Sequence, residues 1–353
     1  MRMKKWGTGI GAVLAVTALV AGCGAAGQSG TNSSPSTNST GGAHSSVKVG
    51  LVTDTGGLND HGFNHLSYVG LQKAEQKLGV QGAVVQSNSA SDYVPNLTRF
   101  AQQGDNLVIA VGFLMQQAVE QVSKEYPNTK FLLIDDAVTD RPNVTSAIFK
   151  TEQCGYLVGA MAGLMQKETG IKGINGKNVL GVIGGQPIPP VNTYIAGFYQ
   201  GAAKTDPGVK ILLKYTNSFT DQAVGQQLAQ NEISNGADIL FPVAGGSGIG
   251  SIDAAKAAGV YAIGVDANQN YLAPNTVITS AMKGVDTSTY QVIKQVVDGT
   301  FKSGIQYFDL ANDGVSIAPA NSVVPQSIVQ QVDKLKQEIQ SGQITVSPNI
   351  PKQ

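Results

Sequence analysis

The sequence predicts an α/β fold built from two lobes, each with a parallel, doubly wound sheet. Short β-branched runs alternate with helical patterns along the chain, and this alternation is typical of parallel sheets covered by helices. The alternation starts again after residue 150, which indicates two similar lobes. The chain has 353 residues, enough for two separate cores, and its 43 glycines suit tight turns at strand ends.

The first series of elements begins at residue 47. Residues 47–53 form a short run rich in β-branched side chains, as expected for a buried strand. From residue 64 to 78, apolar side chains recur at helical spacing. The same patterns predict strands at 83–86, 107–111, 130–135 and 147–150, and helices at 93–103 and 115–126.

The second series repeats this order and ends with a C-terminal helix. A Gly-, Ala- and Met-rich helical pattern opens it at residues 153–166. Strands are expected at 179–184, 210–215, 239–243, 261–265 and 277–282. Helices are expected at 193–205, 223–235, 250–258, 288–298 and 325–341.

Residues 1–22 have the composition of a lipoprotein signal peptide. Basic residues precede an uncharged, mostly apolar run, and small residues stand directly before Cys23. Such a cysteine becomes the lipidated N-terminus after cleavage. An ordinary signal peptide and a membrane-spanning anchor are the alternatives, although the apolar run is short for a span. Residues 23–46 are rich in Gly, Ser, Thr and Asn and predict a flexible tether, so we expect an extracytoplasmic protein held at the cell membrane by its lipid.

The composition argues against nucleic-acid binding, a disulfide and a metal site. Lys plus Arg and Asp plus Glu number 24 each, so the chain lacks the basic surface of a nucleic-acid-binding protein. Once Cys23 is lipidated, only Cys154 remains, and we expect it to be a buried apolar residue. Three histidines and one free cysteine are a poor metal-ligand set. We therefore expect no metal and no cofactor.

Motifs for catalysis are also missing. The glycine-rich stretch 245–250 does not fit G-x-G-x-x-G in register and contains no G-K-[ST]. His61 and His65 have helical spacing, but the glutamate of H-E-x-x-H is absent. Asp54 and Asp60 could form a carboxylate pair, yet no strong partner accompanies them. The sequence therefore predicts a binding protein and not an enzyme.

Short motifs spread along the chain resemble those of the basic membrane protein family. The opening motif is Leu-Val-Thr-Asp-Thr-Gly-Gly-Leu-Asn-Asp at residues 51–60, followed by Gly-Phe-Asn at 62–64. Further matching stretches lie at 111–113, 126–127, 131–135, 149–150, 218–221, 243–246, 264–266 and 279–283. Family members are lipoprotein substrate-binding components of ABC transporters and include purine nucleoside receptors.

The resemblance implies a type I periplasmic-binding-protein fold. Two Rossmann-like lobes would be joined by a three-segment hinge, with crossings near residues 149–151, 265–267 and 308–309. Lobe 1 would then comprise 47–149 plus 267–308, and lobe 2 would comprise 150–266 plus 309–353. A hinge of this kind permits closure as a rigid-body rotation around a ligand.

Three residues are candidates for the binding site from their own context. Asp54 directly follows a predicted strand, and the carboxyl ends of parallel strands line the ligand crevice; capping of the following helix is the alternative. Phe63 and Phe219 lie in polar loops of opposite lobes. A single phenylalanine is usually part of the core, but two in such loops could enclose a flat heterocycle.

The remaining candidates depend on the resemblance. It places a base between Phe63 and Phe219. It also places Asp266 and Lys283 at the sugar, for which a surface salt bridge is the alternative. Asn59 belongs to the opening motif, and Gly246 is the expected backbone contact.

Gln117 stands where many family members carry an aspartate that contacts the base edge. Glutamine both donates and accepts hydrogen bonds, whereas an ionised aspartate only accepts. Adenosine, guanosine, inosine and pyrimidine nucleosides therefore all remain open as ligands.

Taken together, the motifs imply a monomeric, lipid-anchored receptor that delivers a nucleoside, with purines favoured, to an ABC transporter permease. Two other functions stay open from the residues. One is a surface signalling or adhesion lipoprotein that reuses the fold. The other is a receptor for a different small solute such as a sugar.

Overall fold

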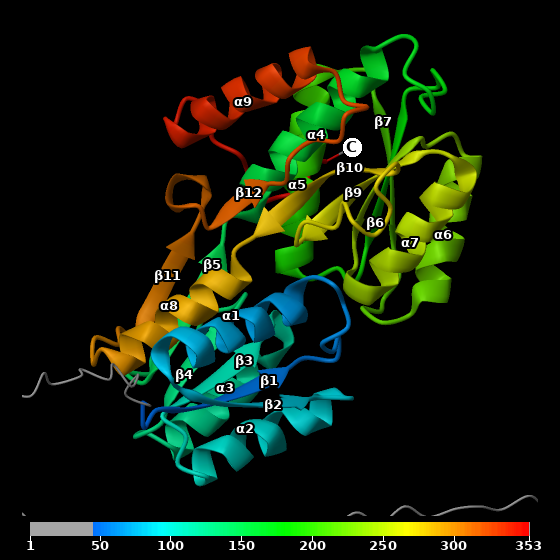
Figure 1. Ribbon diagram of the computed structural model, residues 1–353. Helices are drawn as coiled ribbons and strands as arrows, with labels where there is room; N and C mark the ends of the chain where they lie inside the picture. The colour runs from blue at the N-terminus through cyan, green and yellow to red at the C-terminus, as the bar shows by residue number, and fades with distance from the viewer. Residues whose placement is uncertain (1–44, 353) are drawn as a thin grey trace, which may run out of the picture. The chain divides into compact units, whose positions relative to one another are not determined.

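Two six-stranded sheets with helices on both faces make up the computed structural model, which describes residues 45–352 (Figure 1). The predicted signal peptide, Cys23 and the tether up to residue 44 lie outside the described residues. No helix within residues 45–352 has the length and apolar character needed to cross a membrane. The predicted α/β class with two parallel-dominated sheets is confirmed.

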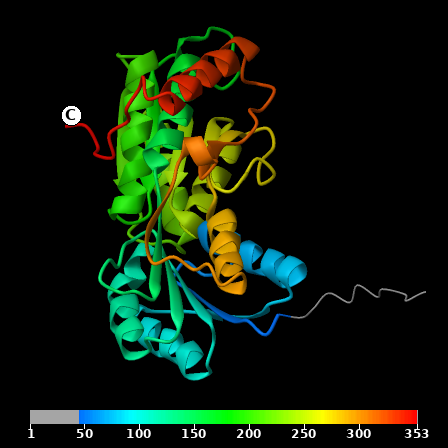
Figure 2. The ribbon, with the colours of Figure 1, turned by 90° about the vertical axis from the view of Figure 1, so that its left-hand side faces the viewer.

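The first sheet is entirely parallel. Its strands, in sheet order, are β11 (Gly304–Phe308), β5 (Val144–Phe149), β4 (Lys130–Ile134), β3 (Leu107–Val111), β1 (Lys48–Thr53) and β2 (Gln81–Gln86). One face is covered by α1 (Phe63–Leu78) and α8 (Val285–Val297), and the other by α2 (Tyr93–Gln102) and α3 (Gln116–Glu125). Figures 1 and 2 both show α8 beside α1.

The second sheet repeats this order and adds one antiparallel edge strand, β12, which pairs with β10. Its strands are β12 (Val315–Ile317), β10 (Val277–Lys283), β9 (Tyr261–Asp266), β8 (Ile239–Val243), β6 (Val179–Gly184) and β7 (Lys210–Tyr215). Its helices are α4 (Thr151–Lys167), α5 (Pro189–Thr205), α6 (Gln222–Ser234), α7 (Gly245–Ala258) and α9 (Gln326–Gln340). The equal strand order explains why the sequence pattern restarts after residue 150.

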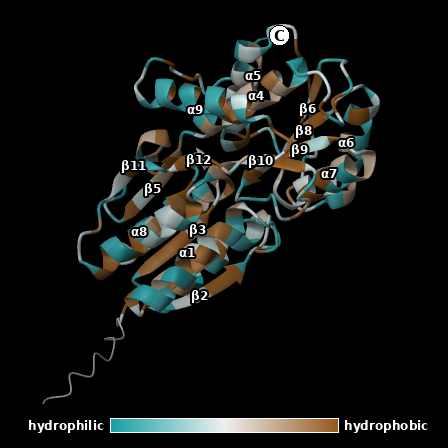
Figure 3. Ribbon diagram, turned by 45° about the horizontal axis from the view of Figure 1, so that its top comes forward, coloured by the Kyte–Doolittle hydropathy of each residue, from teal (hydrophilic) through white to brown (hydrophobic). Residues whose placement is uncertain are grey.

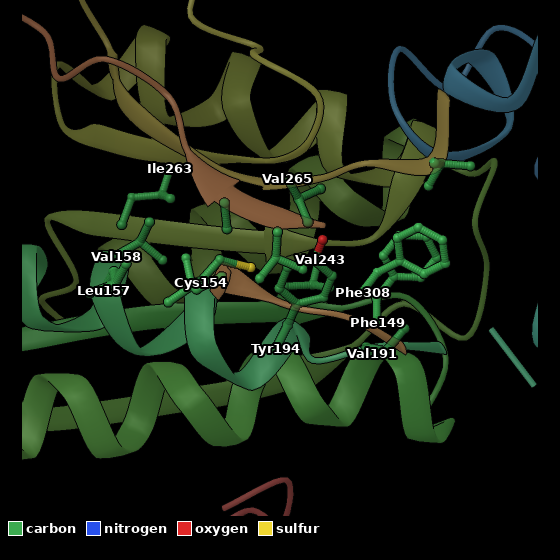
Figure 4. Packing of buried hydrophobic residues seen from close by; sticks show 14 of the residues in the cluster. Phe149, Cys154, Leu157, Val158, Val191, Tyr194, Val243, Ile263, Val265 and Phe308 are labelled. Carbon is green, nitrogen blue, oxygen red and sulfur yellow. The ribbon is translucent and has the colours of Figure 1, made fainter. Parts of the chain in front are cut away.

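The core lies between the sheets and their helices. Strands β3, β6, β8 and β9 are buried along their whole length, because helices cover both faces of a doubly wound sheet. Figure 3 shows hydrophobic residues concentrated in these strands and polar residues on the helices around them. Cys154 is buried in the largest cluster, near Tyr194 and the stacked pair Phe149 and Phe308 (Figure 4).

Three segments connect the two sheets. The first follows β5 at Phe149, and the third follows β11 at Phe308. The backbone N–H of Lys150 donates to the carbonyl of Phe308 at 2.8 Å, and the Lys150 ammonium group pairs with Asp309 at 3.0 Å. These two connections therefore run side by side and support each other.

The position expected for the second crossing, near Asp266, needs correction. Strand β10 pairs in parallel with β9, so both strands belong to the second sheet. The chain leaves that sheet only after Lys283, where α8 begins at Val285 and packs against α1 of the first lobe. Residues 267–283, which the sequence assigned to lobe 1, therefore lie in lobe 2.

Several element limits also differ from the prediction. Strands β11 and β12 were not predicted, since β12 has only three residues and two side chains of β11 face solvent. Helix α7 begins at Gly245, five residues earlier than expected, despite the low helix propensity of its glycines. Close packing on α6 explains those glycines, because a Cβ added to Gly250 would overlap the carbonyl of Gln222.

Candidate functional site

A cavity lies between the carboxyl ends of the two sheets. Strands of both sheets end at it, as expected for parallel sheets, in which ligands bind beyond the carboxyl ends. The residues that line it are Asp54, Gly56, Asp60, Phe63, Asn64, Gly112, Phe113, Asp135, Ile188, Pro190, Val191, Tyr194, Phe219, Val243, Ala244, Gly245, Asp266 and Lys283.

Asp54 is fixed in the cavity wall directly after β1. One of its carboxylate oxygens, Oδ1, accepts hydrogen bonds from the backbone N–H of Gly56 and from Nδ2 of Asn64, both at 2.9 Å. Gly112 after β3 lies so close that an added Cβ would be 2.7 Å from the other oxygen, Oδ2. A glycine at this position therefore keeps space for the Asp54 carboxylate.

The turn that leads into α1 is held by Asp60. Its carboxylate accepts hydrogen bonds from the backbone N–H groups of Gly62, Asn64 and His65, at 3.0, 2.7 and 3.1 Å. These N–H groups lie at the start of the helix, where a carboxylate is favourable. The turn sets the position of Phe63, the first residue of α1.

Phe63 and Phe219 both line the cavity, one from each lobe. Each side chain is half-buried and rests against the hydrophobic core on one side. The Phe219 ring lies against Gly185, where an added side chain would overlap it. The two benzyl groups are thus exposed to the same cavity and are not enclosed within their own lobes.

A cross-lobe ion pair crosses the floor of the cavity. Lys283, the last residue of β10, pairs with Asp135, which follows β4 in the first sheet. The side chains of both residues are almost fully buried, at 2% and 8% exposure. The Lys283 ammonium group also lies 4.6 Å from the centre of the Phe63 ring, within the range of a cation–π contact.

Asp266, the last residue of β9, is held by a hydrogen bond of 3.0 Å that its Oδ1 accepts from the Tyr194 hydroxyl. The backbone of Asp266 has a φ of 62°, and that of Asp135 has a φ of 76°. Non-glycine residues rarely adopt these angles, which cost on the order of 1–3 kcal/mol and cluster at functional sites. The two strained aspartates project into one cavity from opposite lobes.

Burial changes the acidity of these groups. It raises the pKa of Asp54 to about 6, although hydrogen bonds from Asn64 and Gly56 oppose the shift. Burial also raises the pKa of Asp266 to about 6, against the attraction of Lys283 and the hydrogen bond from Tyr194. For Asp135, burial raises the pKa even though Lys283 favours the ionised form. Both carboxyls with a pKa near 6 are largely ionised at neutral pH and can accept hydrogen bonds.

The structure brings five of the predicted ligand residues to the cavity: Asp54, Phe63, Phe219, Asp266 and Lys283. The other three, Asn59, Gln117 and Gly246, do not line it.

Asn59 is exposed and does not line the cavity. Gln117 lies on the outer face of α3, because Ala118, Val119 and Val122 occupy the buried face. Gly246 packs against the backbone of Phe219, and its neighbour Gly245 lines the cavity instead.

The cavity residues that were not among the predicted ones include three with polar side chains, Asp135, Asn64 and Tyr194. Asp135 ends a predicted strand and directly follows β4, so the strand-end argument used for Asp54 could have selected it. Asn64 stands beside Phe63 in the opening motif. Tyr194 gave no signal, since it is a buried residue within a helix.

The site is equipped for noncovalent binding of a ring that carries hydrogen-bond donors. Four aromatic side chains, several acceptor oxygens and one ammonium group surround the space. Residues 45–352 contain no group of three His, Cys, Asp or Glu side chains that could hold a metal ion.

Known proteins with similar sequences and structures include solute-binding proteins of ABC transporters. The family model for PnrA-like substrate-binding proteins of ABC transporters matches residues 47–349. The ABC transporter nucleoside-binding protein BmpA of Lactococcus lactis subsp. cremoris is 33% identical, over 98% of this chain and 99% of its own length. Basic membrane protein A1 of Borrelia garinii subsp. bavariensis is 30% identical, over 86% of this chain and 88% of its own length. A solved ABC transporter solute-binding protein of Aeropyrum pernix K1 has a TM-score of 0.79 at 27% identity, covering 87% of this chain and 94% of that one.

Proposed function

Because this chain belongs to the family of PnrA-like ABC transporter substrate-binding proteins, we propose that it is a lipid-anchored receptor for nucleosides. The ligand binds in the cavity between the lobes, and the closed receptor delivers it to an ABC transporter permease. The lipid anchor at Cys23 is supported by the signal-peptide pattern of residues 1–22. The family membership confirms the resemblance drawn from the motifs.

The observation that carries the proposal is the exposure of Phe63 and Phe219 to one cavity from opposite lobes. Two phenyl rings can stack on the two faces of a planar base, and base–aromatic stacking contributes about 1–3 kcal/mol per base. A sugar alone would use such rings less well, because it has no π face. The curated relative from Lactococcus lactis is named as nucleoside-binding, which agrees with this interpretation.

The polar residues suit the two remaining parts of a nucleoside. Asp266 can accept hydrogen bonds from two adjacent ribose hydroxyls, and Lys283 can donate to a ribose oxygen. Asp54 lies at the other sheet, where its free oxygen can accept from an N–H group of the base edge. With Gln117 outside the cavity, contacts from Asp54, Asn64 and Asp135 are our candidates for reading the base.

The charge of the site favours a ligand without phosphate. Within the described residues, the cavity wall carries four carboxylates, Asp54, Asp60, Asp135 and Asp266, and one ammonium group, Lys283. That ammonium group is already paired with Asp135. A phosphate would therefore meet uncompensated negative charge in a buried site, which is costly.

The test is isothermal titration calorimetry with the chain from residue 24 onward, against a panel of ligands. We expect binding of at least one nucleoside and no detectable binding of its 5′-monophosphate or of free ribose. Binding of a monosaccharide, or of another solute class, in the absence of any nucleoside binding would reject the proposal. The signalling or adhesion alternative predicts that none of these molecules binds.

The stacking residues can be tested in the same titration. Phe63→Ala and Phe219→Ala should each weaken nucleoside binding by about 1–3 kcal/mol, because each removes one ring from the stack. Phe301→Ala is the matched control, since Phe301 is also half-buried but lies outside the cavity. An equal loss of affinity in all three variants would show that the effect is one of stability and not of stacking.

A further inference from the structure

Two loops from opposite lobes meet beside the cavity, and their contacts converge on one residue. His61 lies in the turn between β1 and α1 of the first lobe. Its ring nitrogen Nδ1 is 2.8 Å from the hydroxyl oxygen of Tyr271, and its carbonyl accepts a hydrogen bond of 3.2 Å from Nε2 of Gln269. Gln269 and Tyr271 belong to the loop between β9 and β10 of the second lobe.

The first-lobe side of this contact is rigid. The Asp60 carboxylate fixes the turn around His61 by binding the N–H groups of Gly62, Asn64 and His65. His61 itself has a φ of 52°, a left-handed conformation that non-glycine residues rarely adopt. The next residue, Gly62, lies against Asp266, since an added Cβ would be 3.4 Å from Oδ2 of that carboxylate.

The second-lobe side is fixed as well. The Gln269 side chain is buried, with its Oε1 accepting from the backbone N–H of Val265 at 3.0 Å. The backbone N–H of Gln269 donates to Oγ of Ser280 at 3.1 Å. Strands β9 and β10 thus hold this residue from both sides, and its amide group Nε2 is the part that reaches the other lobe.

Tyr271 would otherwise be an unusual surface residue. Its side chain is 60% exposed, the highest value among the large hydrophobic residues of the described chain. Its ring centre lies 6.2 Å from that of His61 at an angle of 52°. The contact with His61 gives this exposed tyrosine a partner on the opposite lobe.

We propose that His61, Gln269 and Tyr271 form an interlobe latch, which closes over the cavity and slows ligand release without contacting the ligand. The latch joins the segment after β1, which carries Asp54, to the segment after β9, which carries Asp266. Its two hydrogen bonds can exist only while the lobes are together, so they stabilise the closed state selectively. These are positioning residues, since none of the three lines the cavity.

The latch can be tested in the absence of any ligand. Cysteines introduced at Lys124 on α3 and Lys256 on α7 place one fluorophore on each lobe at exposed positions. The native Cys154 is buried and should not react. Single-molecule energy transfer then measures the ratio of closed to open molecules.

We expect Tyr271→Phe and His61→Asn each to lower this ratio by about two- to tenfold, the effect of one hydrogen bond. Asparagine tolerates the left-handed conformation of position 61, so the turn is retained. The double variant should be no more open than either single variant, because both remove the same contact. Tyr307→Phe is the control, since Tyr307 is similarly exposed, at 56%, but lies on β11.

The ligand-bound arm rests on the proposed function and uses the nucleoside that binds in calorimetry. Tyr271→Phe and His61→Asn should each raise the dissociation rate of this nucleoside and leave its association rate unchanged. Unchanged lobe populations, additive effects of the two substitutions, or an equal change in Tyr307→Phe would each overturn the latch. Failure of every nucleoside to bind would reject the proposed function. The energy-transfer measurement without ligand would still test the latch.

Discussion

Two carboxyl groups in the cavity, those of Asp54 and Asp266, are buried, and burial disfavours the ionised form that can accept hydrogen bonds from a ligand. Asp54 and Asp266 are useful to a ligand when ionised, because a carboxylate accepts hydrogen bonds more strongly than the neutral acid. Burial raises the pKa of each to about 6. The ligand-free protein therefore gains stability when these groups take up protons, whereas the proposed contacts with a ligand use their ionised forms.

Acidification should thus have opposite effects on stability and on affinity. The contribution of each raised pKa to stability is complete below the ordinary pKa of 3.8 and is lost as the pH rises through about 6. Per group, this is a slope of about 1.4 kcal/mol per pH unit between those values. Nucleoside affinity should fall over the same interval as the pH is lowered.

Urea unfolding and calorimetry between pH 4 and 7.5 provide the measurement. Asp54→Asn and Asp266→Asn should each remove part of the pH dependence of unfolding, whereas the exposed Asp253→Asn should leave it as in the parent. If affinity stays constant from pH 7.5 to 5 while a nucleoside binds, the carboxylates do not contact it in their ionised form.

The expectation that residues at the ends of parallel strands line the cavity worked where the strand was easily recognised in the sequence. Asp54 follows a hydrophobic run, so its place at the cavity was predictable from the sequence pattern. Asp266 also ends such a run, but the family resemblance selected it. Gln117 lies outside the cavity, and the sequence could not show this because it does not reveal the rotation of α3, which turns the residue outward. Tyr194 could not be predicted, since its hydroxyl contributes to the site by donating a hydrogen bond to Asp266, which is 72 residues away in the sequence.

At the scale of elements, helices α4 and α5 pack unusually closely through glycine. A Cβ added to Gly201 would overlap the carbonyl of Tyr156, and one on Gly159 would overlap that of Phe198. The sequence shows a glycine- and alanine-rich helix, but not which helix it meets. In the same way, the glycines of α7 suggested a loop, because packing against α6 overrides their low propensity.

Gly201→Ala should therefore destabilise the protein, although alanine is the better helix former by about 1 kcal/mol. The added methyl group forces the two helices apart, and overpacking of this kind costs about 1–3 kcal/mol. Urea unfolding measures the change, with Ala203→Ser at an exposed position of the same helix as control. A stabilised Gly201→Ala variant would show that the helices separate freely and that propensity dominates.

For the molecule as a whole, the hinge and the cavity share a residue. Lys283 ends β10 immediately before the chain passes to the first lobe, and its ammonium group pairs with Asp135 across the cavity. The sequence predicted three crossings, but it placed the second near Asp266, since nothing in the pattern shows that β10 returns to the same sheet. The corrected crossing puts a cavity charge directly at the hinge.

This arrangement predicts that the Lys283–Asp135 pair controls the separation of the lobes. Lys283→Met keeps the length of the side chain but leaves the Asp135 carboxylate buried without its partner, a change that costs about 3–5 kcal/mol when the site cannot open. In a hinged molecule the carboxylate can regain water by opening of the cleft, so we expect small-angle X-ray scattering to show a larger radius of gyration.

Adding Asp135→Asn to the Lys283→Met variant removes the unpaired charge and should restore the compact form. Lys294→Met, which breaks an exposed pair with Asp298 at the C-terminal end of α8, serves as control and should change neither the radius of gyration nor the unfolding free energy. If the Lys283→Met protein stays compact and its unfolding free energy falls by the full amount of about 3–5 kcal/mol, the lobes form one rigid core and do not move at this hinge.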